Sequence, residues 1–156
     1  MTSRVRSLNH IGVVVEDIDA ATEFFVDLGL ELQGKSVVGG PLVGGIVGLE
    51  NPESDIVFLR AADGGTALEL TKFRTHPDEQ GPRAEPPNRL GLRHLAFEVE
   101  GLHGILAELR AKGFETVGTV EDYEGVYRLC YVRGPEGIIV ELAEEIGAGS
   151  ASTSNA

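Results

Sequence analysis

The chain has 156 residues, of which 42% are hydrophobic, enough to build a core for one compact domain or two small fused modules. Asp and Glu number 25 against 13 Lys and Arg, and the formal net charge of −12 argues against nucleic acid or an anionic membrane as a partner. The single cysteine, Cys130, excludes an intrachain disulfide. No apolar run of about 18 residues is present, and the first ten residues lack the apolar centre of a signal peptide. We therefore expect a soluble cytoplasmic protein.

The first half of the chain alternates short apolar runs with one helical pattern. We predict strands over 8–15, 30–38, 55–61 and 66–73, a helix between Asp17 and Gly29, and a loop or irregular edge over 39–54. Asp17 or Asp19 can cap the helix, and Gly29 ends it. The segment 39–54 contains five glycines and two prolines, a composition typical of loops. Asp63-Gly64-Gly65 predicts a hairpin turn between the last two strands.

The second half repeats this order after a long break. Residues 74–91 contain four prolines and two glycines and are interpreted as a linker, which at this length is often functional. We then predict strands over 93–100, 114–119, 127–133 and 138–145, a helix over 102–112 and a turn over 134–137. The tail 147–156 has no core-forming residue, so we expect it to be disordered.

The two halves are copies of one pattern. Residues 9–31 and 93–115 align without a gap, so that His10 matches His94 and Gly29 matches Gly113. Each copy is followed by an apolar run with one carboxylate, ALEL at 67–70 and IVEL at 139–142. Each half therefore reads as βαβββ, with a helix on one face of a small sheet and the other face free to enclose a ligand. The predicted fold class is α+β, with module one over about 7–73 and module two over about 92–146.

Four polar side chains stand out because each lies in a predicted strand, away from its large apolar neighbours: His10, Glu69, His94 and Glu141. Small residues such as Gly12 and Ala96 share their faces, which leaves room for a cavity. A single such residue is more often just solvated, but equivalent His and Glu positions in both copies favour a shared site. Two imidazoles and two carboxylates suit a divalent Ni, Co, Zn, Fe or Mn ion.

The motifs NHIGVVVEDIDAATEFFVDLGLE, ALEL, GLRHLAFEVEGL and YVRGPEGIIVELAE make the chain resemble the vicinal oxygen chelate (VOC) superfamily, the glyoxalase/bleomycin resistance protein/dioxygenase group. The resemblance extends over about 7–146. It implies two tandem βαβββ modules that form a curved, half-open mixed sheet around one central divalent metal ion. It also implies His10, Glu69, His94 and Glu141 as the ligands of that ion.

The set His/Glu/His/Glu resembles bacterial glyoxalase I, a lactoylglutathione lyase. The resemblance implies a metal-dependent lyase or isomerase that chelates two adjacent substrate oxygens while a carboxylate shuttles a proton. Glu141 is favoured as the catalytic base, with Glu69 as the other candidate. The alternatives are an epimerase similar to methylmalonyl-CoA epimerase, an extradiol-type dioxygenase using His10, His94 and Glu141, and a non-catalytic protein that binds an antibiotic or metabolite.

Several further side chains are candidates for binding a small-molecule substrate. Arg74, Asn88 and Arg89 belong to the densest basic group, which could receive carboxylates or phosphates, although an ordinary solvated linker explains them as well. Tyr127 and Arg128 precede the last strand and could line the mouth of a pocket. We also expect a homodimer, because small half-open sheets leave strand edges and apolar surface to cover.

Overall fold

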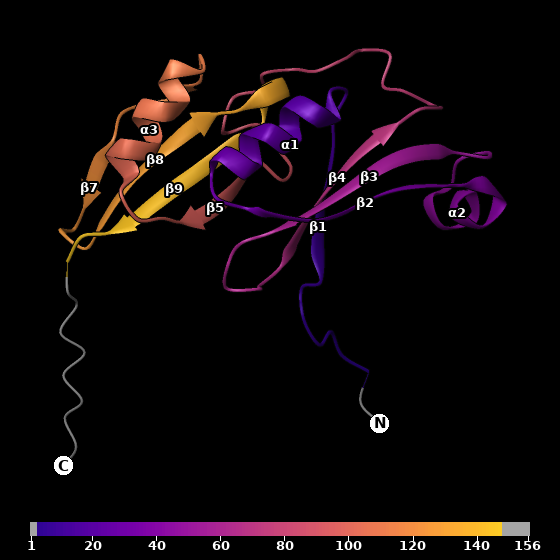
Figure 1. The fold of residues 1–156 in the computed structure, drawn as a ribbon, viewed down its shortest axis with the longest axis horizontal. Helices are drawn as coiled ribbons and strands as arrows, with labels where there is room; N and C mark the ends of the chain where they lie inside the picture. Colours follow the sequence, from indigo (N-terminus) through magenta and orange to yellow (C-terminus); the bar gives the residue numbers. More distant parts are fainter. Residues whose placement is uncertain (1–2, 148–156) are drawn as a thin grey trace. The chain divides into compact units, whose positions relative to one another are not determined.

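A computed structural model of the protein describes residues 3–147. The predicted disordered tail lies, from residue 148 onward, outside the described residues. The chain divides into two units, Met1–Arg83 and Ala84–Ala156, each built on its own sheet. Figure 1 colours the first unit from indigo to magenta and the second from orange to yellow.

The first unit holds one four-stranded sheet and two helices. Its elements are β1 (His10–Val14), α1 (Ile18–Asp27), β2 (Glu31–Gly39), α2 (Gly40–Val47), β3 (Glu53–Arg60) and β4 (Ala67–Phe73). The strand order is β1-β4-β3-β2, with β1 parallel to β4 and the other neighbours antiparallel. The predicted hairpin of the last two strands is confirmed. The sheet is mixed because β4, the last strand of the unit, lies beside β1 and runs parallel to it.

Helix α1 forms as its sequence predicts and closes one side of this sheet. The Asp17 carboxylate accepts a hydrogen bond from the Ala20 amide at 3.0 Å, so the predicted N-cap is confirmed. Phe24 and Phe25 are almost fully buried where α1 packs on β3 and β4. The strand residues Leu59 and Leu70 are completely buried and belong to the same core.

Helix α2 corrects the prediction that 39–54 is loop or irregular structure. It follows β2 directly and lies at the end of that strand (Figure 1). A Cβ atom on Gly44 would lie only 2.5 Å from the Leu49 carbonyl oxygen. Only glycine at position 44 therefore lets the helix pack this closely against the turn that follows it. Pro41 in the first turn and the left-handed Gly48 at the end (φ +74°) delimit the helix. Glycines that usually indicate a loop here serve close packing and capping.

The second unit again pairs its first and last strands in parallel, but the opposite edge of its sheet is built differently. Its elements are β5 (His94–Glu98), α3 (Leu102–Ala111), β6 (Glu115–Thr116), β7 (Glu121–Tyr123), β8 (Tyr127–Arg133), the short 3₁₀ turn η1 (Pro135–Gly137) and β9 (Ile139–Glu145). The order is β5-β9-β8-β6, with β5 parallel to β9 and β7 also paired with β8. Helix α3 lies over β9 and buries Leu102, Leu106 and Leu109 (Figure 1).

The edge of this sheet corrects the prediction of one strand over 114–119. Only Glu115–Thr116 pairs regularly with β8, and the unpredicted β7 pairs with β8 farther along. The pairing partners shift by two residues between β6 and β7, so the edge strand is interrupted around Gly118, where the chain bulges away from β8. The fold class is nevertheless as predicted, an α+β fold with two mixed βαβββ-like sheets. Within the described residues, no helix is long and apolar enough to span a membrane.

Candidate functional site

In the first unit, the parallel pairing of β1 with β4 brings His10 and Glu69 together. Gly12 is the register partner of Glu69, and His10 lies two residues before it on the same face of β1. The neighbours of Glu69 along β4, Leu68 and Leu70, point the other way and are buried. The His10 Nε2 and Glu69 Oε2 atoms are 3.7 Å apart. This pair therefore lies on the face of the sheet opposite its apolar core.

Each member of the first pair makes a hydrogen bond to a residue outside the pair. The His10 ring nitrogen Nδ1 lies 2.8 Å from the Asn9 amide oxygen Oδ1, which accepts a hydrogen bond from Nδ1–H. The Thr71 hydroxyl donates to Glu69 Oε1 at 3.1 Å. The ring of Phe58 packs edge-on against His10, with 5.9 Å between the ring centroids.

In the second unit, β5 and β9 bring together His94 and Glu141 in the same register. Ala96 is the partner of Glu141, as Gly12 is of Glu69. His94 Nε2 lies 3.2 Å from Glu141 Oε2. The His94 ring packs on Tyr131, with 4.9 Å between centroids and 35° between the ring planes. Among the residues that the structure describes, no hydrogen-bond donor other than His94 contacts the Glu141 carboxylate.

Both pairs have the donor set that a divalent metal ion requires. Two ligand atoms bound at ~2.1 Å to one ion lie ~3.0–3.4 Å apart. The second pair, at 3.2 Å, falls within this range, and the first pair, at 3.7 Å, is wider. The histidine side chains are 42% and 36% exposed and the glutamates about half as much, so the donors are accessible without being fully solvated. Within residues 3–147, no three His, Cys, Asp or Glu side chains form a metal-binding group, and ligation by the four residues stays a prediction.

Two of the arginines considered for substrate binding are engaged by nearby carboxylates. The Arg74 guanidinium makes a bidentate contact with Asp55, at 2.6 and 2.9 Å, and also contacts Glu53 at 2.7 Å. The hydrogen bonds from Arg74 hold the pKa of Asp55 below its usual value. In the second unit, Arg128 binds Asp122 in the same way, and the pKa of Asp122 is also lowered.

The remaining candidates are distributed over exposed segments. Asn88 and Arg89 lie in the irregular segment before β5, where the Arg89 side chain is 3.9 Å from Glu85. Tyr127 begins β8 and is 37% exposed. Cys130 is buried inside β8, and burial raises the pKa of its thiol, which suits a packing role better than a nucleophilic one.

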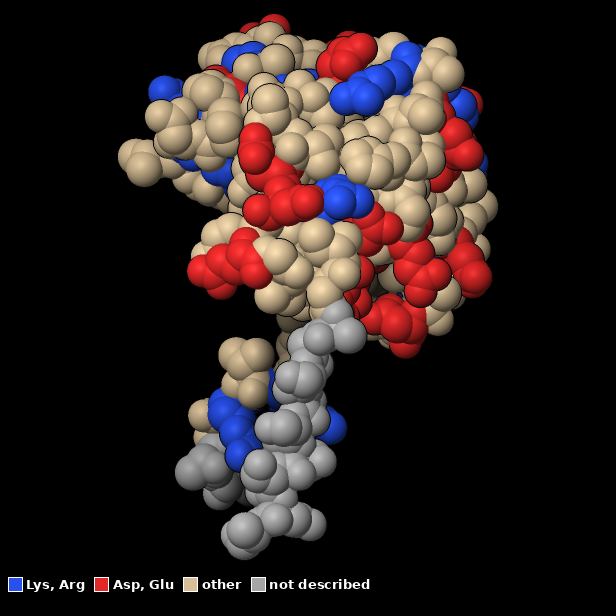
Figure 2. Space-filling view, turned by 90° about the vertical axis from the view of Figure 1, so that its left-hand side faces the viewer, with Lys and Arg blue, Asp and Glu red and all other residues tan. Residues whose placement is uncertain are grey.

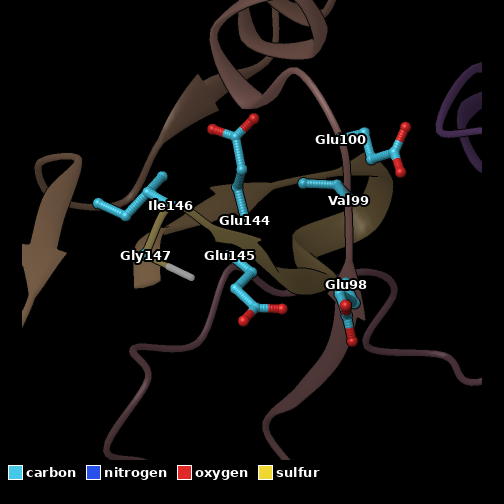
Figure 3. Close-up of a pocket in the computed structure, with 7 residues that line it drawn as sticks. All are labelled: Glu98, Val99, Glu100, Glu144, Glu145, Ile146 and Gly147. Atoms are coloured by element: carbon cyan, nitrogen blue, oxygen red, sulfur yellow. The ribbon is translucent and has the colours of Figure 1, made fainter. Parts of the chain in front are cut away.

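The second unit also has an acidic pocket of about 360 Å³ where β5 and β9 end, shown in Figure 3. It is lined by Glu98, Val99, Glu100, Glu144, Glu145, Ile146 and Gly147. Glu98 and Glu145 point to one side of the sheet and Glu144 to the other (Figure 3). Figure 2, which faces this unit, shows acidic side chains gathered over its surface. The pocket offers negative charge and no catalytic pair, so it does not suit an anionic substrate.

In the first unit, three residues that contact the candidate ligands were not predicted as site residues: Asn9, Phe58 and Thr71. For Thr71 a signal exists, because it lies two residues after Glu69 and period two puts both on one face. Asn9 precedes β1, and Phe58 comes from β3, whose pairing with β4 sets it opposite Glu69. The Phe58 contact depends on strand pairing, which residue spacing alone does not specify, whereas Asn9 is the direct sequence neighbour of His10.

Comparisons with known proteins show the family of the chain and its fold. The family model of the Glyoxalase/Bleomycin resistance protein/Dioxygenase superfamily matches residues 7–142. The chain is 25% identical over 142 residues to the uncharacterized protein YwkD of Bacillus subtilis, which covers 90% of this chain and 98% of YwkD. The same identity and coverage hold for the uncharacterized protein YaeR of Escherichia coli.

Among solved structures, a glyoxalase family protein from Bacillus cereus is 38% identical, with a TM-score of 0.89 over 93% of this chain and 97% of that one. The trypanothione-dependent glyoxalase I of Leishmania major shares the fold at 22% identity, with a TM-score of 0.63 over 90% of this chain and 88% of that one. The likeness to the Leishmania enzyme is one of fold alone.

Proposed function

Because the chain belongs to the Glyoxalase/Bleomycin resistance protein/Dioxygenase superfamily, a largely enzymatic group whose members bind small molecules, we propose that it is a divalent-metal-dependent lyase or isomerase of the glyoxalase I type. Its substrate is a small molecule with two adjacent oxygens, such as the adduct of a 2-oxoaldehyde with a thiol. One observation carries the proposal: each repeat holds a His–Glu pair in the same strand register, with 3.7 Å and 3.2 Å between the facing nitrogen and oxygen atoms.

In this proposal, His10, Glu69, His94 and Glu141 hold one ion of Ni, Zn, Co, Fe or Mn. The donor set fits, since imidazole nitrogens and carboxylate oxygens are the ligands that such borderline ions accept. The bound ion acts as a Lewis acid that offsets the negative charge developing on substrate oxygens when a proton leaves carbon. The small partners Gly12 and Ala96 leave space beside the two carboxylates for the substrate.

The proton itself is moved by a glutamate of the chain. Glu141 is the favoured base, because its carboxylate is 21% exposed and contacts only the His94 ring among the described residues. A carboxylate that takes a proton from one carbon and returns it to the neighbouring one completes an isomerisation without any external acid. Glu69 is the second candidate and retains its Thr71 contact.

Metal analysis tests the ligand set first. Protein prepared without chelators should contain one divalent ion per chain, and His10→Ala and His94→Ala should each lose it, because both pairs contribute to one ion. His103→Ala, at an exposed position on α3, is the matched control and should retain the metal. Retention of a full complement of metal by either site variant would contradict a shared four-ligand site.

Solvent exchange tests the reaction class. Adducts of methylglyoxal with glutathione or coenzyme A, incubated in D₂O with metal-loaded protein, should be converted to the thioester with deuterium incorporated at carbon. Glu141→Gln should retain metal and lose about 10²–10⁴-fold in rate. Full turnover by this variant would exclude Glu141 as the base. Oxygen consumption with a catechol and Fe(II) would indicate a dioxygenase instead, and metal-independent ligand binding unchanged in His10→Ala would indicate a sequestering protein.

A further inference from the structure

The two His–Glu pairs differ in what surrounds them. Thr71 follows Glu69 by two residues on the same face, and the equivalent residue after Glu141 is Ala143. Asn9 precedes His10, and the equivalent residue before His94 is Arg93. The first pair therefore has a hydroxyl and an amide at positions where the second pair has a methyl group and a guanidinium.

We propose that Thr71 and Asn9 are positioning residues that hold Glu69 and His10 in fixed orientations and so prepare the first pair to bind a divalent metal ion. This inference rests on the proposed function. It adds a difference in restraint between two pairs that are otherwise equivalent in the repeat.

The Asn9 contact selects the state of the His10 ring. An amide oxygen only accepts hydrogen bonds, so Nδ1–H is the donor, and Nε2, the atom 3.7 Å from Glu69, is the ring nitrogen left to face a metal ion. A ligating histidine usually donates its other N–H to an oxygen, which fixes the ring and strengthens it as a ligand. Asn9 supplies that acceptor from the residue next to the ligand.

The Thr71 contact selects the orientation of the Glu69 carboxylate. Its hydroxyl donates to Oε1, which leaves Oε2, the oxygen nearest His10, available as a ligand. Thr71 is 8% exposed and β-branched, so its side chain has little freedom to turn away. Both groups of the first pair are thus held by a hydrogen bond from outside the pair.

The second pair lacks both restraints. Ala143 has no hydroxyl, and the guanidinium of Arg93 offers no acceptor for His94 Nδ1–H. The Arg93 Nε atom is itself buried without a hydrogen-bond partner in the described part of the chain. Packing on Tyr131 holds the His94 ring, but the Glu141 carboxylate has no contact equivalent to that of Thr71. The first pair is thus restrained by two hydrogen bonds that have no equivalent in the second pair.

Cobalt binding to the whole chain tests the inference without requiring a substrate. Thr71→Val keeps the shape of the side chain and removes the hydroxyl, and Thr71→Ser keeps the hydroxyl. Thr71→Val should weaken Co(II) binding about 10–100-fold, as loss of a hydrogen bond to a metal ligand generally does, and change the visible Co(II) spectrum, whereas Thr71→Ser should restore both. Asn9→Ala, at an exposed position, should weaken binding in the same direction.

The mirror variant Ala143→Thr gives Glu141 the hydroxyl that it lacks. It should raise Co(II) affinity, because the added hydroxyl can hold the Glu141 carboxylate as Thr71 holds Glu69. Unchanged Co(II) affinity in both Thr71→Val and Asn9→Ala, with the parent protein binding Co(II), would overturn this inference alone. Failure of the parent protein to bind Co(II), Ni(II) or Zn(II) would overturn the proposed function and this inference with it.

Discussion

The two units of this protein share one framework and differ in the polar groups attached to it. In both, the histidine strand runs parallel to the glutamate strand, and the residue two positions after the histidine is the partner of the glutamate. Backbone pairing therefore sets the His–Glu spacing in each unit. The side chains that hold the pair diverge, with hydrogen bonds to His10 and Glu69 in the first unit and an aromatic ring against His94 in the second. A duplicated scaffold can thus carry the same His–Glu pair with different neighbouring side chains.

The largest expected effect tests the shared framework. Leu70 and Leu142 occupy equivalent positions one residue after the glutamates, and both are fully buried. Leu70→Ala and Leu142→Ala should each lower the free energy of unfolding by about 2–5 kcal/mol, through lost burial and the cavity left behind. Urea denaturation measures the effect. Leu42→Ala, at an 80% exposed position in α2, is the control and should change stability by less than about 0.5 kcal/mol. If only one of the two variants lowered the free energy of unfolding, the equivalent leucines would not contribute equally to the cores of the two units.

A smaller loss of stability is expected from removing the N-terminal caps of helices α1 and α3, which differ between the two units. Helix α1 is capped locally by Asp17, whereas the α3 N-terminus has no cap from its own segment and uses Glu144 of β9. The Glu144 carboxylate accepts from the Gly101 amide at 2.7 Å and from the Leu102 amide at 3.4 Å. Asp17→Ala and Glu144→Ala should each cost about 1 kcal/mol of stability.

Thermal unfolding of the two cap variants measures that cost. Glu145→Ala, which removes the neighbouring exposed carboxylate, is the control for Glu144→Ala and should be close to neutral. Equal stability of Glu144→Ala and Glu145→Ala would show that the long-range cap contributes nothing.

The smallest expected effect concerns the Arg–Asp pair in each unit. Hydrogen bonds from Arg74 and Arg128 lower the pKa of Asp55 and Asp122. A lowered carboxyl pKa contributes stability that is present above the ordinary pKa and is lost as the pH falls through the folded-state pKa. Both pairs are exposed, so the contribution is small. In a carboxyl NMR titration, Arg74→Met should raise the pKa of Asp55 toward its ordinary value and leave that of Asp122 unchanged. A simultaneous rise at Asp122 would contradict independent pairs.

Much of the framework could be predicted because local chemistry specifies it. Period two places Glu69 and Glu141 opposite buried neighbours, and helical spacing with Asp17 and the terminal glycines defines α1 and α3. Helix α2 was missed because glycine composition predicts a loop unless the close approach at Gly44 is known. The short strand β7 was missed because three polar residues at a sheet edge carry no hydrophobic period.

By itself, the amino-acid sequence determined the repeat, the α+β class, the family and the identity of the four candidate ligands, because these depend on residue type and spacing along one chain. The tertiary structure alone decided which side chains from other strands contact the candidate residues. The engagement of Arg74 by Asp55, the cap that Glu144 provides and the contact of Phe58 with His10 all join residues from different strands or helices. Such contacts depend on strand order and register, and these become defined only when the sheets have formed.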